Sequence, residues 1–142
     1  MDRVTKEQRS RNMSKVRSKD TTPERIVRTY LFKRGFRYRI ADKRYPGHPD
    51  IVLPKYKTVI FVHGCFWHQH PNCKKATIPN SNKEFWITKL QRNVERDREQ
   101  INELEALGWN VLVVWECELN KARQKETLEK LCEEIINGKN NI

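Results

Sequence analysis

The chain has 142 residues, a length that fits one folded domain, and its 29 basic residues exceed its 18 acidic residues by 11 charges. Its best apolar runs, 59–62 and 111–115, are far shorter than the roughly 18 residues of a membrane-spanning helix. The first fifteen residues also lack the apolar core of a secretory signal. We therefore expect a folded, cytoplasmic, basic protein that binds a polyanion and no membrane.

The excess positive charge is concentrated in the first third of the chain. Residues 1–48 contain 15 Lys and Arg against 5 Asp and Glu, whereas residues 49–142 contain 14 against 13. A basic segment attached to a nearly neutral body is typical of nucleic-acid binding. We expect residues 1–20 to form a basic DNA-binding arm and residues 21–142 to form a single domain, which we take to be a monomer.

The first half of that domain is predicted to contain one helix and three strands. Thr21 caps a helix that has Pro23 in its first turn and ends at Gly35. Residues 36–40 alternate apolar and basic side chains and predict a strand. Two further strands are expected at 50–53 and 58–62, joined by a turn.

The second half begins with an irregular segment, 63–82. A long helix is predicted over about 83–107 and stops at Gly108, and residues 109–115 predict a buried strand. A last amphipathic helix follows, with Leu128, Leu131, Ile135 and Ile136 on one side. This order predicts a mixed α/β domain.

Histidine and cysteine gather in the irregular segment. All four histidines fall within residues 48–70, and two of the four cysteines lie at or near the end of that stretch. Such a cluster indicates a metal site, and zinc prefers four tetrahedral nitrogen or sulfur ligands. Cys65, His70 and Cys73 supply three ligands from one loop, and Cys117 is a better fourth candidate than Cys132, which we assign to the core. The closed ligand set favours a structural zinc; disulfides are disfavoured in the cytoplasm.

Asp50 is the candidate metal-binding acid, because it stands at the start of an apolar strand that holds it rigidly. Phosphodiester hydrolysis uses a cation on the phosphate, and Mg²⁺ is bound by carboxylate oxygens. Adjacent strands bring Asp50 near the Val62 carbonyl and the His63 side chain. His63 and His68 remain outside the zinc set and are candidates to activate water, with Glu24 as a further member.

Aromatic residues near this segment are candidates for contacts with bases. Phe66 and Trp67 lie inside the metal-binding loop, and Trp86 opens the long helix. Aromatic side chains on a basic surface stack on bases or wedge between them. We expect Phe85, Trp109 and Trp115 in the core. Met13 of the arm either inserts in the minor groove of DNA or packs against the protein itself.

Several motifs together resemble the very short patch repair (Vsr) endonucleases. They are Arg9-Ser-Arg-Asn-Met13, Pro46-Gly-His-Pro-Asp50, Val59-Ile-Phe-Val-His-Gly-Cys-Phe-Trp-His68, Glu84-Phe-Trp86, Asn93-Val-Glu-Arg-Asp-Arg98 and Leu107-Gly-Trp to Val114-Trp-Glu-Cys117. Their order and spacing cover roughly residues 8–137, and His-Gly-Cys-Phe-Trp-His is a specific signature.

The resemblance implies a restriction-endonuclease-like sheet flanked by helices, with a structural Zn²⁺ site. It also implies a Mg²⁺-dependent nick 5′ of the T in a T:G mismatch left by deamination of 5-methylcytosine, which starts short patch repair. The residues that match the family's functional positions are Asp50 and the Val62 carbonyl for Mg²⁺, His63, His68 and Glu24 for catalysis, Cys65, His70, Cys73 and Cys117 for zinc, and Phe66, Trp67 and Trp86 for the wedge.

Arg9 and Arg11 belong to the arm that we expect to clamp the DNA backbone. Other mismatch-repair proteins are candidate partners. Two alternatives stay open: a zinc-stabilised DNA-binding module without catalysis, and a restriction-like nuclease that cuts without regard to a mismatch.

Overall fold

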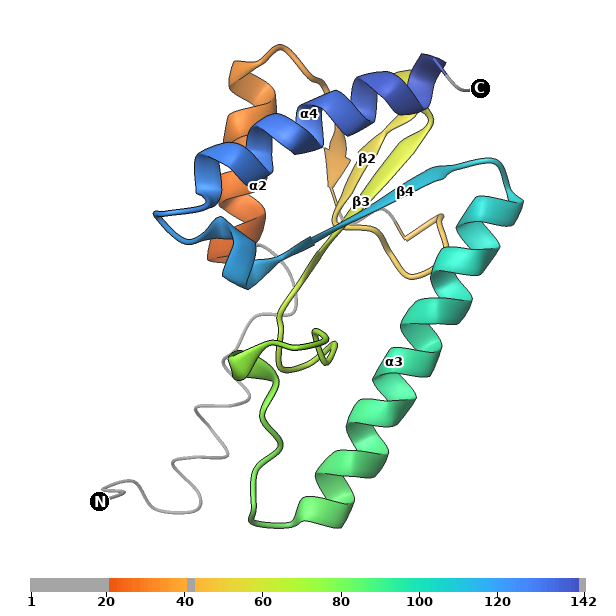
Figure 1. Cartoon of the computed structure of the whole chain (residues 1–142). Coiled ribbons are helices and arrows are strands. Elements are labelled where there is room, and N and C mark those ends of the chain that lie inside the picture. Colours follow the sequence, from red (N-terminus) through yellow and green to blue (C-terminus); the bar gives the residue numbers. More distant parts are fainter. Residues whose placement is uncertain (1–20, 41–42, 141–142) are drawn as a thin grey trace.

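The computed structural model describes residues 21–40 and 43–140, which form a four-stranded sheet with helices on both faces (Figure 1). The main elements are α2 (Thr22–Lys33), β1 (Arg39–Ile40), β2 (Ile51–Leu53), β3 (Thr58–His63), α3 (Lys83–Ala106), β4 (Asn110–Trp115) and α4 (Gln124–Asn140). Short 3₁₀ turns lie at Pro54–Tyr56, Lys74–Ala76 and Glu116–Leu119. The predicted mixed α/β class is confirmed, whereas the finer restriction-endonuclease-like assignment stays a prediction.

The sheet is mixed, with strand order β1-β2-β3-β4. β1, β2 and β3 pair antiparallel, and β3 pairs parallel with β4 over its whole length, from Thr58 opposite Asn110 to His63 opposite Trp115. A parallel pair needs a long crossover, and α3 lies within the segment that provides it. The carboxyl ends of β3 and β4 therefore meet at one edge of the sheet.

Alternation along the central strands divides the core into two layers. Ile60 and Val62 of β3 pack towards α2 and α4, together with Leu31 and Ile135 of those helices. Val59 and Phe61 point to the opposite face and pack with Leu104 of α3. Figure 1 shows the same arrangement, with α2 and α4 on one side of the sheet and α3 on the other. His63 follows Phe61 in this alternation, so it is directed to the α3 side.

The structure shortens the strand expected over 36–40 to Arg39–Ile40. The reason is that the Phe36 backbone N–H still bonds the carbonyl of Leu31 in the turn that ends α2, and its ring packs on Tyr56 at 5.2 Å between centroids. Gly35 enables that turn with φ of +91°, a value that side chains disfavour.

Three expectations about burial were wrong, those for β4, Phe85 and Ile136. β4 is mostly half-buried because it forms the edge of the sheet, and Trp115 at its end is likewise half-buried, whereas Trp109 just before it packs against the α3 core layer as expected. Phe85 is 58% exposed because it faces outward at the start of α3, and Ile136 is also exposed. Cys132, by contrast, packs against the α2–α4 core layer as expected.

None of the described helices combines the length and apolar character that crossing a lipid bilayer demands.

The end of α3 provides a matched test of this packing. Leu104 is fully buried in the α3 layer, whereas Leu107, one turn later, is 61% exposed. We expect Leu104→Ala to lower the free energy of unfolding by about 3 kcal/mol, because it leaves a cavity. Leu107→Ala should change it by less than about 0.5 kcal/mol. Urea unfolding followed by circular dichroism measures both, and equal losses would contradict the placement of α3.

Candidate active site

The start of β2 and the end of β3 bring the candidate acid and histidines together. Ile51 pairs with Ile60, so Asp50 lies beside the last residues of β3. The backbone N–H of Val62 donates to Oδ2 of Asp50 at 2.7 Å. This bond fixes the carboxylate against the strand whose next residue is His63, as the sequence predicted.

Glu24 supplies a second buried carboxyl group at the same place. It lies in the first turn of α2, where Thr21 accepts a hydrogen bond from its N–H and Pro23 starts the helix, and it is only 3% exposed. The pKa of Asp50 is raised to about 7, chiefly by burial and also by the charge of Glu24 and a hydrogen bond with its carboxyl group, while the Val62 bond opposes the shift. Two acids held this close need a shared proton or a cation. This oxygen-rich pair fits Mg²⁺, which uses one or two carboxylates.

His63, His68 and Asp97 form a second cluster, on the α3 side of the sheet. Their ligand-type atoms lie within 4.8 Å of one another. Nδ1 of His68 is 2.5 Å from Oδ2 of Asp97, and the rings of His63 and His68 stack at 3.8 Å between centroids, only 6° from parallel. Because parallel rings direct their nitrogen lone pairs in separate planes, His63 and His68 are poorly placed to bind one metal ion together.

The environment lowers the pKa of both His63 and Asp97, which leaves His63 neutral and Asp97 ionised. Burial lowers the pKa of His63 to about 4, and the neighbouring His68 acts in the same direction. His63 is therefore neutral near pH 7, and its Nδ1 has no hydrogen-bond partner among the described residues. Burial would raise the pKa of Asp97, but the hydrogen bond and charge of His68 outweigh it and keep that pKa low. The ionised Asp97 can thus orient His68, as a carboxylate orients the histidine of a catalytic triad.

The structure also brings Cys65, His70, Cys73 and Cys117 together, with all four ligand atoms within 4.8 Å of one another. Nδ1 of His70 lies 3.7 Å from Sγ of Cys65 and 3.3 Å from Sγ of Cys117. A tetrahedral ion with bonds of about 2.3 Å to sulfur and about 2.0 Å to nitrogen separates such atoms by about 3.5 Å. The donor set and its spacing therefore fit zinc, and all four cysteines of the chain are free thiols.

Surrounding groups hold this Cys/His cluster in place. The Cys65 N–H donates to Oε1 of Glu116 at 3.2 Å, and the His70 ring stacks on Trp115 at 4.2 Å. Burial raises the pKa of the Cys65 thiol to about 12. A thiol in such surroundings becomes a thiolate only against a cation, which agrees with a metal at this position. Trp115 also contacts His63 edge-on at 5.1 Å, so one ring separates the two clusters.

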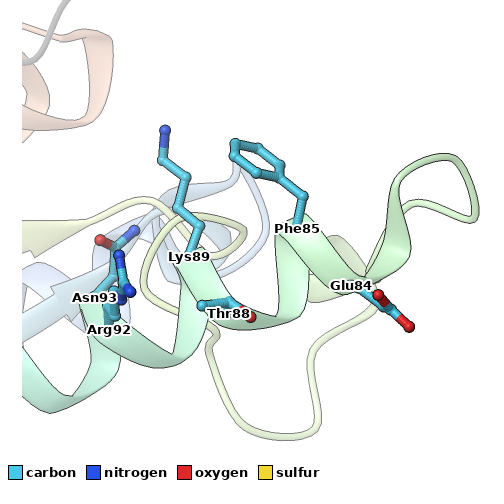
Figure 2. A pocket seen from close by; sticks show the side chains of 6 residues that line it. All are labelled: Glu84, Phe85, Thr88, Lys89, Arg92 and Asn93. Atoms are coloured by element: carbon cyan, nitrogen blue, oxygen red, sulfur yellow. The ribbon is translucent and has the colours of Figure 1, made fainter.

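An aromatic cluster lies beside the histidines and is formed by Phe66, Trp67, Phe85 and Trp86. Phe66 and Trp67 both contact Trp86, at 5.5 and 5.9 Å between ring centroids, and Phe85 contacts Trp86 at 5.3 Å. The Lys89 ammonium lies about 6 Å from the rings of Trp67 and Trp86. An open groove of about 540 Å³ lies along the start of α3 and is lined by Phe85, Lys89 and Asn93 among others (Figure 2). This combination of rings and positive charge suits base stacking.

The structure thus groups the described site residues into four sets. Asp50, Val62 and Glu24 form the first; His63 and His68 form the second; Cys65, His70, Cys73 and Cys117 form the third; Phe66, Trp67 and Trp86 form the fourth. Arg9, Arg11 and Met13 lie outside the described residues. Asp97 was missed, although it stands in the Asn93–Arg98 motif, because only the packing of α3 on the sheet brings it to His68.

In metal-free protein, Asp50 and Asp97 should make the free energy of unfolding change with pH in opposite directions. The folded state keeps Asp50 protonated up to about pH 7, whereas the unfolded chain releases this proton near pH 3.8, so stability falls as pH rises through that window. Asp50→Asn should therefore stabilise the protein at pH 7.5, by about 2–4 kcal/mol, and have little effect at pH 4.

Asp97→Asn serves as the matched variant. The pKa of Asp97 is low in the folded state, so the stability that its ionised carboxylate contributes is present above pH 3.8 and is lost only in stronger acid. This variant should be less stable than the wild type at pH 7.5. Thermal unfolding with EDTA across pH 4–8 measures both, and destabilisation by Asp50→Asn at pH 7.5 would contradict the buried acid pair.

Comparison with known proteins agrees with the motifs. The profile of the DNA mismatch endonuclease Vsr family matches residues 1–75. A type II nicking enzyme of Neisseria meningitidis serogroup A is 56% identical over 135 residues, covering 94% of this chain and 96% of the relative. The DNA mismatch endonuclease Vsr of Escherichia coli K12 is 45% identical over 127 residues, covering 89% and 80%. The chain belongs to the Vsr DNA mismatch endonuclease family.

Proposed function

We propose that this protein is a Mg²⁺-dependent endonuclease that nicks one strand of double-stranded DNA on the 5′ side of the T in a T:G mismatch. The observation that carries this proposal is that the buried acid Asp50, beside Glu24, is bonded to Val62, and that the next residue of the same strand, His63, is stacked on His68. Relatives described as a DNA mismatch endonuclease and as nicking enzymes support the same chemistry. The nick would start short patch repair after deamination of 5-methylcytosine.

Asp50, with Glu24 beside it and the Val62 carbonyl, would hold the Mg²⁺. When bound there, the ion supplies Lewis-acid polarisation of the scissile phosphate. Without it, the acid pair retains a proton near neutral pH, since the pKa of Asp50 is about 7. Cation binding would therefore release that proton, so affinity for Mg²⁺ should increase with pH.

His68 is the residue we assign as general base. Asp97 fixes its Nδ1, which leaves the other ring nitrogen to accept a proton from the attacking water. Water attacks phosphorus as His68 takes its proton, the bond from phosphorus to the 3′ oxygen breaks, and that oxygen takes a proton from solvent, which gives a 3′-hydroxyl and a 5′-phosphate. His63 stays neutral and is stacked on His68, so its role is to position that ring.

The Cys/His cluster would hold a structural zinc rather than take part in hydrolysis. Four protein ligands leave no open position for substrate or water. An ion there would join the loop after β3 to the turn after β4, and that loop includes Phe66, Trp67 and His68. Zinc would thus keep both the aromatic cluster and the general base in position.

The aromatic cluster would open the base stack at the mismatch. Unstacking requires least free energy where pairing is already poor, which gives a physical basis for mismatch selection. Residues 1–20, with Arg9, Arg11 and Met13, would form an arm that grips the DNA beside the nuclease domain of residues 21–142. Binding should weaken steeply with salt because phosphate contacts release counterions.

A strand-resolved nicking assay tests this function. We expect a nick 5′ of the T in a T:G duplex with Mg²⁺, little cutting of the T:A duplex, and none with EDTA. Asp50→Ala should lower the rate by about 10³-fold or more while DNA binding is retained. Tight binding without cutting in any sequence context would favour a non-catalytic module. Equal cutting of both duplexes would indicate a restriction-like nuclease.

The zinc site is tested with a pair of cysteine variants. Wild-type protein should contain one zinc per chain, and Cys117→Ser should lose most of it. We expect unfolding stability to fall by about 3 kcal/mol, or roughly 10 °C in Tm. Cys132→Ser, which lies outside the cluster, should keep its metal. Equal zinc content in the two variants, measured by elemental analysis, would contradict the ligand assignment.

A further inference from the structure

Arg96 is a charged residue beside the histidine cluster that the proposed mechanism does not use. Its Nη2 lies 3.6 Å from Oδ1 of Asp97, while Oδ2 of the same carboxylate is 2.5 Å from His68. The distance of 3.6 Å is too long for a hydrogen bond, so the contact is one of charge alone. The Arg96 side chain is 54% exposed, whereas that of Asp97 is 12% exposed. The guanidinium is therefore held next to the catalytic groups with its donors open to solvent.

Arg96 also continues a basic ridge along α3. With 3.6 residues per turn, Phe85, Lys89, Arg92 and Arg96 fall on one side of the helix. Lys89 lies against the rings of the aromatic cluster, and Figure 2 shows it on the same side as Phe85, with Arg92 further along the helix. The ridge thus leads from the aromatic cluster, at one end, to His68 and Asp97 at the other. A row of positive charges of this kind attracts a phosphate backbone.

The guanidinium group of Arg96 is suited to binding a phosphate. A guanidinium presents five donors in a planar fork that matches two oxygens of one phosphate, whereas an ammonium acts as a point charge. Asp97 occupies only a small part of this capacity. Fixed cationic donors at the phosphorus are most effective where charge develops in the transition state.

We propose that Arg96 binds the non-bridging oxygens of the phosphate at which the strand is cut. This inference rests on the proposed function, because it takes the cluster of His63, His68 and Asp97 as the reacting centre. Asp97 then has two tasks: Oδ2 orients the general base, and Oδ1 keeps Arg96 near the phosphate before DNA arrives.

Three variants of the full-length protein test the kinetic part. Arg96→Gln should lower the single-turnover nicking rate of a T:G duplex by about 10²–10³-fold, and Arg96→Lys by about tenfold, because it keeps the charge but not the fork. Arg98→Gln is the matched control, since Arg98 is exposed on the opposite side of the same helix. It should nick within about twofold of wild type. Thermal unfolding should show that all three variants are folded.

A binding experiment without metal distinguishes direct phosphate contact from an effect through Asp97. One T:G duplex carries a neutral methylphosphonate at the scissile position, and a second carries it four nucleotides away. The first change should weaken wild-type binding by about tenfold and leave Arg96→Gln binding unaffected. The second should affect both proteins equally.

Two results would overturn the proposal. One is nicking by Arg96→Gln at the rate of Arg98→Gln; the other is an equal loss of affinity for wild type and Arg96→Gln at the scissile methylphosphonate. Wild-type protein that binds the unmodified T:G duplex but never nicks it would instead refute the proposed function, and this inference with it.

Discussion

The antiparallel register between β2 and β3 sets the position of Asp50 relative to Val62 and His63, and the other groups of the candidate site lie around this pair of strands. Because Ile51 lies opposite Ile60, Asp50 reaches the N–H of Val62, and the next residue, His63, is directed to the α3 side. The parallel pairing of β3 with β4 then places Trp115 beside His63. A shift of one residue in this register would move His63 to the opposite face of the sheet and separate it from Asp97.

The same arrangement places groups in the interior that metal-free protein accommodates poorly. Asp50 is an acid whose pKa is raised to about 7, His63 has a buried nitrogen without a partner among the described residues, and the Cys65 thiol has a pKa near 12. Each of these groups becomes favourable with a cation or a reacting phosphate. We infer that Asp50 and His63 serve the reaction at a cost in the stability of the metal-free protein, whereas Cys65 serves the structural metal site.

Sequence reasoning predicted the parts of the structure that depend on local signals. The Thr21 cap, Pro23, Gly35 and Gly108 mark helix boundaries within about two residues, and the Cys/His cluster was visible because most of its members are close in sequence. Asp97 was missed because a 24-residue helix has several polar positions, and only its rotation against the sheet selects one of them. Phe85 was misplaced for the same reason, since its neighbour Trp86 carries the inward contacts.

The central claim is that the pair His68–Asp97 acts as one unit at the reacting centre. A double-mutant cycle measures this directly, through single-turnover nicking of a T:G duplex with Mg²⁺ by His68→Ala, Asp97→Asn and the double variant. The account predicts that Asp97→Asn slows the His68→Ala variant by a much smaller factor than it slows the wild type, because Asp97 acts mainly through His68. If the nicking rate of the double variant instead falls, relative to the wild type, by the product of the two single-variant factors, that result would contradict the claim.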